Sequence, residues 1–181
     1  MKIMFASDIH GSAYYCRKTL ECFDKEKADR LFILGDILYH GPRNNLSMEY
    51  APKEVLAMLN ERKNEISAVR GNCDTEVDQM VLEFPILADY ALLEVNGLRM
   101  YATHGHIFNE KNMLPMMPGD ILIHGHTHIY MAKKAGENYI LNPGSTSLPK
   151  GGNPPTYAVL DGKTFQIKEL DGSVVKEFHF D

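Results

Sequence analysis

Short apolar runs alternate with amphipathic stretches along the first half of the chain. Residues 2–6 (KIMFA) and 30–34 (RLFIL) are continuous apolar runs of strand length. Between them, apolar residues recur at helical spacing after a serine that can cap a helix: Ser12, then Ala13, Cys16, Leu20 and Phe23. This alternation predicts an α/β core that contains parallel strands.

The same pattern continues to about residue 84. Pro52 is suited to the first turn of a helix that presents an apolar stripe, and residues 66–69 form the next strand. A further helix is expected within residues 74–84.

Turn signals dominate the second half. Asn96-Gly97 predicts a hairpin between residues 91–95 and 98–103, because this dipeptide adopts the tight turn that joins two antiparallel strands. Asp161-Gly162 and Asp171-Gly172 predict a meander, with residues 164–180 as edge strand and packing. With no repeat and no linker composition, residues 1–181 are expected to form one domain.

Composition and charge narrow the function classes. The chain is 44% hydrophobic and 24% charged, which is typical of a globular protein. Its net charge of −5 argues against stable binding of duplex nucleic acid. The apolar run at the amino terminus is too short for a secretory signal or a membrane span, so a cytoplasmic protein without a membrane partner is expected.

Residues capable of metal chemistry follow the predicted strands. They are Asp8 and His10, Gly35-Asp36, Gly71-Asn72, His104-Gly105-His106, and Gly125-His126-Thr127-His128. Because the carboxyl ends of parallel strands meet at one edge of a sheet, these groups are expected to converge. Carboxylate, amide and imidazole donors suit manganese, iron or zinc, and one aspartate can bridge two ions. Asp36 is the candidate bridge.

The ordered motifs carry a resemblance to a known family. DIH at 8–10, GD at 35–36, GNCD at 71–74, HGH at 104–106 and GHTH at 125–128 resemble the calcineurin-like metallophosphoesterase superfamily. The stretches PRNN at 42–45 and NPGS at 142–145 extend the resemblance to its small bacterial phosphodiesterases. Five motifs in order are far more specific than any one of them.

The resemblance implies a fold, a ligand set and an activity. The fold is an α/β four-layer αββα sandwich with a dimetal site at the carboxyl ends of the core strands. The implied ligands of one ion are Asp8, His10 and His128; those of the other are Asn72, His104 and His126; Asp36 bridges them. The implied activity is hydrolysis of a small phosphodiester by a metal-bridging hydroxide. Manganese is the expected ion, and iron, zinc and nickel are compatible with the same donors.

Cys73 departs from much of the superfamily, which has a histidine at this position thought to donate a proton or stabilise charge. A thiol carries no positive charge at neutral pH and is a poorer proton donor in this geometry. Our hypothesis is that Cys73 lies beside the metals without binding them and shapes the substrate pocket. Its presence favours a diester substrate over a monoester with a poor leaving group.

Other candidates keep two interpretations each. His40 and His106 are candidate catalytic residues, although His40 is equally explained as a surface histidine and His106 as a residue that orients a metal ligand. Arg43 is a candidate for binding a phosphate oxygen, or a solvated loop residue. His124 is expected to be structural.

The alternative functions are a phosphomonoesterase or protein phosphatase, and a non-catalytic interaction scaffold on the same fold. Homodimerisation stays open.

Overall fold

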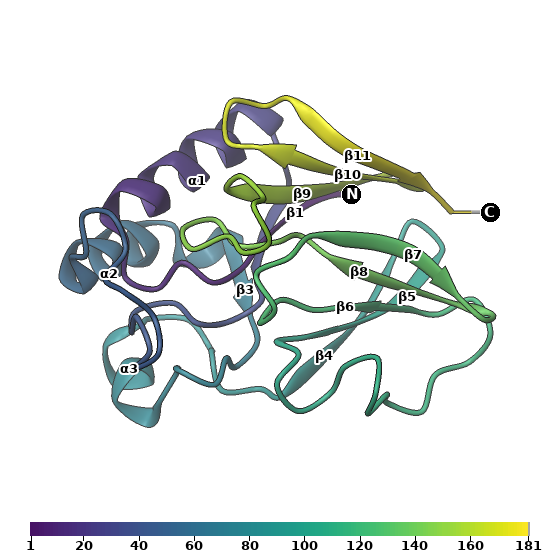
Figure 1. Cartoon of the computed structure of the whole chain (residues 1–181), viewed down its shortest axis with the longest axis horizontal. Helices are drawn as coiled ribbons and strands as arrows, with labels where there is room; N and C mark the ends of the chain where they lie inside the picture. The colour runs from purple at the N-terminus through teal and green to yellow at the C-terminus, as the bar shows by residue number, and fades with distance from the viewer. Residues whose placement is uncertain (181) are drawn as a thin grey trace.

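Two β-sheets packed face to face form the centre of the molecule. The computed structural model describes residues 1–180 (Figure 1). The first sheet has the order β11-β10-β9-β1-β2-β3, with β1 (Lys2–Ala6), β2 (Arg30–Ile33), β3 (Ile66–Ala68), β9 (Thr156–Asp161), β10 (Thr164–Glu169) and β11 (Val174–His179). The second sheet has the order β4-β5-β6-β8-β7, with β4 (Tyr90–Val95), β5 (Leu98–Thr103), β6 (Ile121–Ile123), β7 (Met131–Ala135) and β8 (Asn138–Asn142).

The helices begin where the sequence signals indicate. Helix α1 (Ala13–Glu26) starts after Ser12, whose hydroxyl accepts a hydrogen bond from the Tyr15 amide. Helix α2 (Pro52–Glu61) has its proline in the first turn, and α3 (Glu76–Val81) starts with a reciprocal capping box. A single 3₁₀ turn (Lys63–Glu65) precedes β3. None of the helices within residues 1–180 combines the length and apolar character needed to cross a membrane.

Alternating side chains of β1 divide the core into two parts. Ile3 and Phe5 point toward the second sheet and pack with the core between the sheets. Met4 and Ala6 point the other way and pack beneath α1 and α2. The first sheet is therefore buried on both faces, which explains why its strands read as continuous apolar runs in the sequence.

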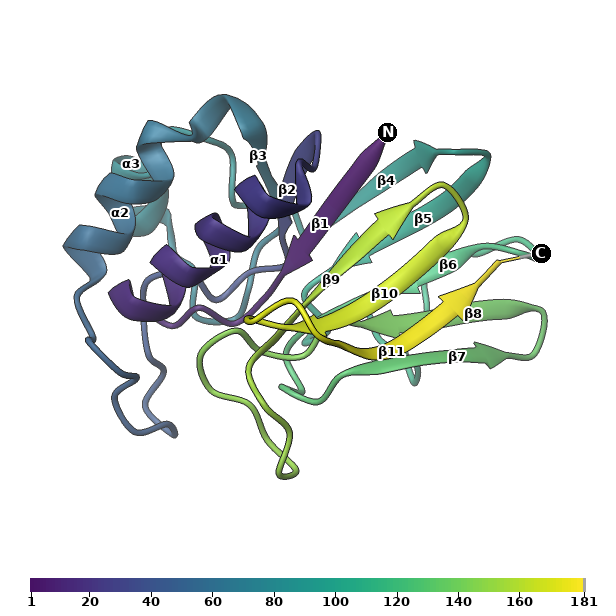
Figure 2. The ribbon, with the colours of Figure 1, turned by 90° about the horizontal axis from the view of Figure 1, so that it is seen from above.

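The two outer layers differ in kind. In both views α1, α2 and α3 gather on one side of the sheets (Figures 1 and 2). The expected α/β sandwich of two sheets with flanking helices is confirmed. On the second sheet, however, Leu122 and Ile140 lie outside the core between the sheets and are fully buried. On the outer face of the second sheet, the fourth layer of the sandwich is the irregular segment 104–120 and not a helix. The Tyr101 hydroxyl of β5 donates to the Pro115 carbonyl of this segment.

Parallel pairing places the carboxyl ends of the strands that carry the motifs at one edge of the sandwich. β1, β2 and β3 run parallel in the first sheet, and β5 and β6 run parallel in the second. Loops leave the carboxyl ends of these strands at residues 7, 34, 69, 104 and 124. Each of the five motifs therefore starts at the same edge of the sandwich.

Candidate metal centre

The backbone at this edge adopts an uncommon conformation. Among residues 1–180, eight residues other than glycine have a positive φ, and five of these are expected metal ligands: Asp8, His10, Asp36, His126 and His128. Their φ values lie between 47° and 65°, in the left-handed region that aspartate and histidine tolerate better than bulky residues. Such strain persists only where the surrounding structure enforces it, and it concentrates at functional sites.

Asp8, His10 and His128 form one half of the cluster. The Asp8 carboxylate is completely buried, and its Oδ1 lies 3.2 Å from Nε2 of His128 and 3.7 Å from Nε2 of His10. The two imidazole Nε2 atoms are 3.4 Å apart. Three side chains from segments distant in sequence therefore direct their donor atoms to one point.

Asn72, His104 and His126 form the other half. Nε2 of His104 lies 3.1 Å from Oδ1 of Asn72 and 3.2 Å from Nδ1 of His126. Asp36 stands between the halves, because its Oδ2 is 3.4 Å from Nε2 of His104 and 3.6 Å from Nε2 of His10. This position is the one a bridging carboxylate requires.

Backbone carbonyls set the orientation of three imidazoles. The Nδ1 atoms of His10, His104 and His128 lie 2.8, 2.6 and 2.5 Å from the carbonyl oxygens of Tyr39, Leu34 and Leu148. An imidazole that donates its Nδ1 hydrogen to a carbonyl presents an unprotonated Nε2 on its other side. These three Nε2 atoms all face the cluster, where a metal ion would replace any proton that they carry.

The electrostatics of the cluster fit bound cations. Burial favours the neutral form of Asp8, but its interaction with His128 and the nearby His104 and His10 hold its pKa below the usual range. Burial opposes protonation of His104, yet Asp36 and Asp8 raise its pKa to about 9. Oδ1 of Asp8 is buried with no hydrogen-bond partner. Such an oxygen is costly unless a cation neutralises it, so the donor set suits a metal.

A carboxylate outside the ligand set holds two of the turns together. Asp74 is buried and accepts hydrogen bonds from the amides of Asp36, Ile37 and Gly71 at 2.7–2.9 Å. Burial raises its pKa to about 6. Sequence reasoning missed this role, since the amides of Asp36 and Ile37 belong to a turn almost forty residues away.

The NPGS stretch braces the opposite side. Hydroxyls of Ser145 and Ser147 donate to the carbonyl of Asp8 at 3.0 and 2.8 Å. The Asn142 side chain donates to the carbonyl of Gly125 and the hydroxyl of Thr127. The stretch thus connects the Asp8 turn to the GHTH turn, a function that its letters alone did not reveal.

Two glycines permit the close approach of neighbouring turns at the cluster. A Cβ at Gly71 would lie 2.1 Å from Oδ1 of Asp36, and a Cβ at Gly125 would lie 1.9 Å from the hydroxyl of Ser7. That hydroxyl donates to Oδ2 of Asp8. Larger residues at either position would displace a carboxylate of the cluster.

Cys73 contacts the cluster mainly through its backbone. Its amide donates to Oδ1 of Asp36 at 2.8 Å, and its sulfur accepts a hydrogen bond from the Asn72 side chain. The thiol lies near His10 and Asp36, within 4.8 Å of their donor atoms. Burial and the charge of Asp36 raise its pKa to about 12. A Cβ at Gly41 would lie 3.2 Å from the sulfur, so the 41–44 turn packs directly on it.

The other histidines occupy different surroundings. The His40 ring packs edge-to-face against Tyr39 and Tyr50, at centroid distances of 4.7 and 5.2 Å. The His106 ring lies 5.4 Å from that of His104, and burial lowers its pKa. His124 is buried and its Nδ1 lies 3.0 Å from the Gly125 carbonyl, in agreement with the structural role expected of it.

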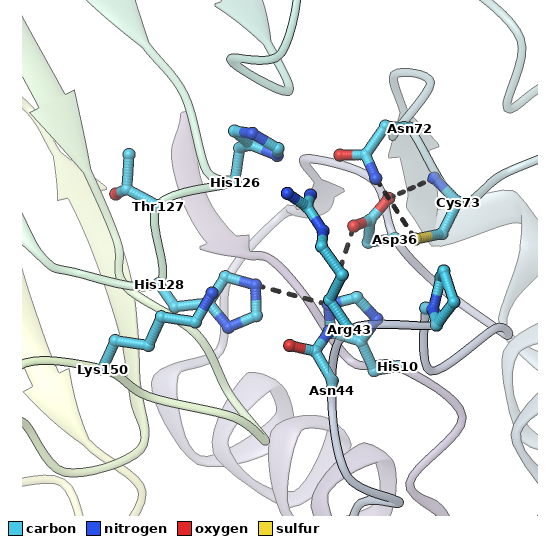
Figure 3. Close-up of a pocket in the computed structure, with 12 residues that line it drawn as sticks. His10, Asp36, Arg43, Asn44, Asn72, Cys73, His126, Thr127, His128 and Lys150 are labelled. Carbon is cyan, nitrogen blue, oxygen red and sulfur yellow. Dashed lines mark hydrogen bonds and ion pairs between the residues drawn. The ribbon is translucent and has the colours of Figure 1, made fainter.

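A cleft of about 410 Å³ opens over the cluster (Figure 3). His10, Asp36, Asn72 and two further residues of the ligand set line its floor. Arg43 and Lys150 line its mouth from separate loops. Lys150 was not among the residues singled out from the sequence, because a lysine in a glycine-rich loop has no pattern that distinguishes it from a solvated one.

Comparisons with known proteins agree with the motifs. A family model described as the calcineurin-like phosphoesterase superfamily domain matches residues 1–164. Phosphodiesterase YfcE of Escherichia coli K12 is 47% identical over 178 residues, which cover 98% of this chain and 97% of that protein. A solved structure of the E. coli protein, described as a phosphoesterase, superposes with a TM-score of 0.97 at 46% identity over 100% of both chains. Phosphodiesterase MJ0936 of Methanocaldococcus jannaschii is 26% identical over 94% of this chain and 98% of that protein.

Proposed function

The chain belongs to the calcineurin-like phosphoesterase superfamily, and from this premise we propose that it hydrolyses phosphodiesters at a centre of two divalent metal ions. It is a metallophosphoesterase. The proposed ligands are Asp8, His10, Asp36, Asn72, His104, His126 and His128. One observation carries the assignment: donor atoms of His10, Asp36, His104 and His128, from four strand ends, gather around a buried carboxylate oxygen of Asp8 that has no hydrogen-bond partner.

Bound divalent ions would supply charge neutralisation for a phosphoryl group and a nucleophile at neutral pH. We assign manganese as the native ion, because carboxylate, amide and imidazole donors suit it and no thiolate is needed. Iron, zinc and nickel accept the same donors. The rate of hydrolysis by chelator-treated protein after addition of each metal separately tests the assignment.

The protein's own residues hold and orient the reacting groups. His10 and His128 present Nε2 to the centre because backbone carbonyls bind their Nδ1 atoms. The amide of Cys73 fixes Oδ1 of Asp36 and leaves Oδ2 directed at both groups of histidines. Arg43 extends its guanidinium over the cleft, where it can bind an oxygen of the substrate (Figure 3).

A diester is preferred over a monoester for a reason that lies at position 73. A monoester carries one more negative charge than a diester, and its hydrolysis benefits from a cationic proton donor on the leaving-group side. Cys73 supplies neither a positive charge nor an imidazole as proton donor, and the His40 ring packs edge-to-face against two tyrosines. The phosphomonoesterase and scaffold alternatives are not favoured.

The test compares bis(p-nitrophenyl) phosphate with p-nitrophenyl phosphate. Both release the same chromophore, so a rate difference reports the substrate class. We expect metal-dependent hydrolysis of the diester and at least tenfold slower hydrolysis of the monoester, a difference of about 1.4 kcal/mol in activation free energy. Faster monoester hydrolysis would contradict the proposal.

A further inference from the structure

Two cations at the mouth of the cleft lack a partner among residues 1–180. Among residues 1–180 five of the six arginines donate to a carboxylate or a carbonyl, and Arg43 is the exception. The Lys150 ammonium likewise forms neither an ion pair nor a hydrogen bond within the described part of the chain. Since most arginines of this protein are paired, an unpaired one over the candidate active site calls for an external anion.

The backbone holds Arg43 at the tip of a tethered turn. The Asn44 amide donates to the Gly41 carbonyl, and the Asn44 side chain donates to the carbonyl of His40. Beneath this turn lies Cys73, and beyond it Ser47 donates to the carbonyl of His10. The position of Arg43 is therefore linked to two residues beside the metal centre.

Lys150 is tethered in a comparable way on the other side. Its amide donates to the carbonyl of His128 at 3.0 Å, and its carbonyl accepts from the amide of Asn153. Gly151 and Gly152, both with positive φ, allow the tight turn between these two hydrogen bonds. The backbone of Lys150 is thus bonded directly to a proposed metal ligand.

The charges around the cleft are unbalanced. Asp36 is the sole carboxylate among the residues that line it, and that group belongs to the metal centre. The side chains of Arg43 and Lys150 reach over the cleft from opposite sides (Figure 3). A diester phosphate has a single negative charge, which the metal centre would bind. Two further cations are complementary to a second anionic group on the same substrate.

We infer that Arg43 and Lys150 form an oxyanion subsite, and that the natural substrate is a phosphodiester with a second anionic group, a phosphate or a carboxylate, near the hydrolysed bond. The inference rests on the proposed function. The subsite would select among phosphodiesters by charge, whereas the metal centre would act on all of them.

Three synthetic diesters test the subsite. Each has p-nitrophenol as leaving group, and the second ester group is 2-methoxyethyl, carboxymethyl or 2-phosphonooxyethyl. For wild-type protein we expect the better of the two anionic diesters to have a kcat/KM about tenfold higher than the neutral diester. Charged hydrogen bonds between the subsite and the second anionic group would account for this difference. The anionic diester with the larger ratio identifies carboxylate or phosphate as the preferred group.

Matched variants separate the subsite from the overall charge of the protein. We expect the anionic-to-neutral ratio to fall toward one in the double variant Arg43→Gln with Lys150→Met. Arg43→Lys retains the charge and is expected to keep an intermediate ratio. Lys176→Met removes a positive charge from exposed β11 and is expected to keep the wild-type ratio. An equal loss in Lys176→Met, or an unchanged ratio in the double variant, would overturn the inference.

A binding measurement independent of turnover completes the test. Inorganic pyrophosphate is titrated calorimetrically into chelator-treated protein, where the metal centre cannot contribute. We expect the dissociation constant to be about tenfold higher in the double variant than in wild type or Lys176→Met. Equal affinities in all three, including no binding in any, contradict the subsite. No hydrolysis of the neutral diester by the metal-loaded wild type would instead contradict the proposed function.

Discussion

At the residue scale, the candidate metal centre depends on conformations that cost free energy. Five of the proposed ligand residues have left-handed backbone, each at a cost of about 1–3 kcal/mol. Hydrogen bonds to the Asp74 carboxylate and from the Ser145 and Ser147 hydroxyls hold the turns in which these residues lie. The ligand atoms are therefore positioned before any cation binds, which lowers the cost of ordering them on binding.

The first prediction concerns Cys73. We expect Cys73→Ala to keep its metal content, because the substitution retains the backbone amide that donates to Oδ1 of Asp36. Cys73→His is expected to lower the diester rate, since an imidazole would collide with the turn at Gly41 that carries Arg43. Metal content by mass spectrometry and the rate on bis(p-nitrophenyl) phosphate measure the two effects. Loss of metal in Cys73→Ala would mean that the thiol is a ligand.

The second prediction concerns Asp74. Asparagine has one carbonyl oxygen where aspartate has two carboxylate oxygens, so its NH2 group would face at least one backbone N–H donor in this buried site. We expect Asp74→Asn to lower the free energy of unfolding of metal-free protein by about 2–4 kcal/mol, measured by urea denaturation.

The control is Asp161→Asn, whose side chain is 68% exposed. We expect this change to alter the free energy of unfolding by less than about 0.5 kcal/mol. An equally small effect of Asp74→Asn would show that the three hydrogen bonds do not hold the turns.

At the element scale, the strands and helices that carry the motifs could be predicted from the sequence. The apolar run at 2–6 and the Ser12 cap give β1 and α1 as observed, because each signal is local. The hairpin at Asn96-Gly97 is also observed. The roles of Asp74 and Asn142 could not be predicted, since their partners lie in other elements and hydrogen bonds of this kind leave no periodic pattern.

A partly buried ionic group joins α1 to the first sheet and gives a prediction about pH. Glu26, at the end of α1, accepts hydrogen bonds from Tyr157 of β9 and Lys168 of β10, and pairs with Lys2 at 3.0 Å. Burial favours its neutral form, but Lys168 and Lys2 hold its pKa below the ordinary value of 4.5.

A lowered pKa makes Glu26 stabilising when it is ionised. Its contribution is complete above pH 4.5 and disappears as the pH falls through the lowered pKa. We expect Glu26→Gln to destabilise the protein at pH 7, and the difference from wild type to shrink below pH 4.5, in urea denaturation at several pH values. The control Glu61→Gln, exposed at the end of α2, should show no such trend. A constant difference for Glu26→Gln across pH would contradict the account.

At the scale of the whole molecule, the two sheets and their shared edge follow from the order of the motifs. Parallel strands in each sheet bring residues 8, 36, 72, 104 and 126 to one place. The segment 104–120 was harder to predict, because its residues show no regular period, although its Pro115 carbonyl accepts a hydrogen bond from Tyr101 of β5. The subsite residue Lys150 was missed for a similar reason: its position depends on the His128 carbonyl, a contact between loops.

The central claim is that the strand-end residues together hold two divalent ions, with Asp36 between them. The most direct test is the manganese content of chelator-treated, reloaded and desalted protein, measured by mass spectrometry for wild type, Asp36→Ala and the surface control His179→Ala. We predict two ions per chain in wild type and in His179→Ala, because the His179 side chain is 67% exposed on β11 and its ring pairs with Glu177. We predict the loss of at least one ion in Asp36→Ala. Two ions retained in Asp36→Ala, or none bound by wild type, would contradict the account.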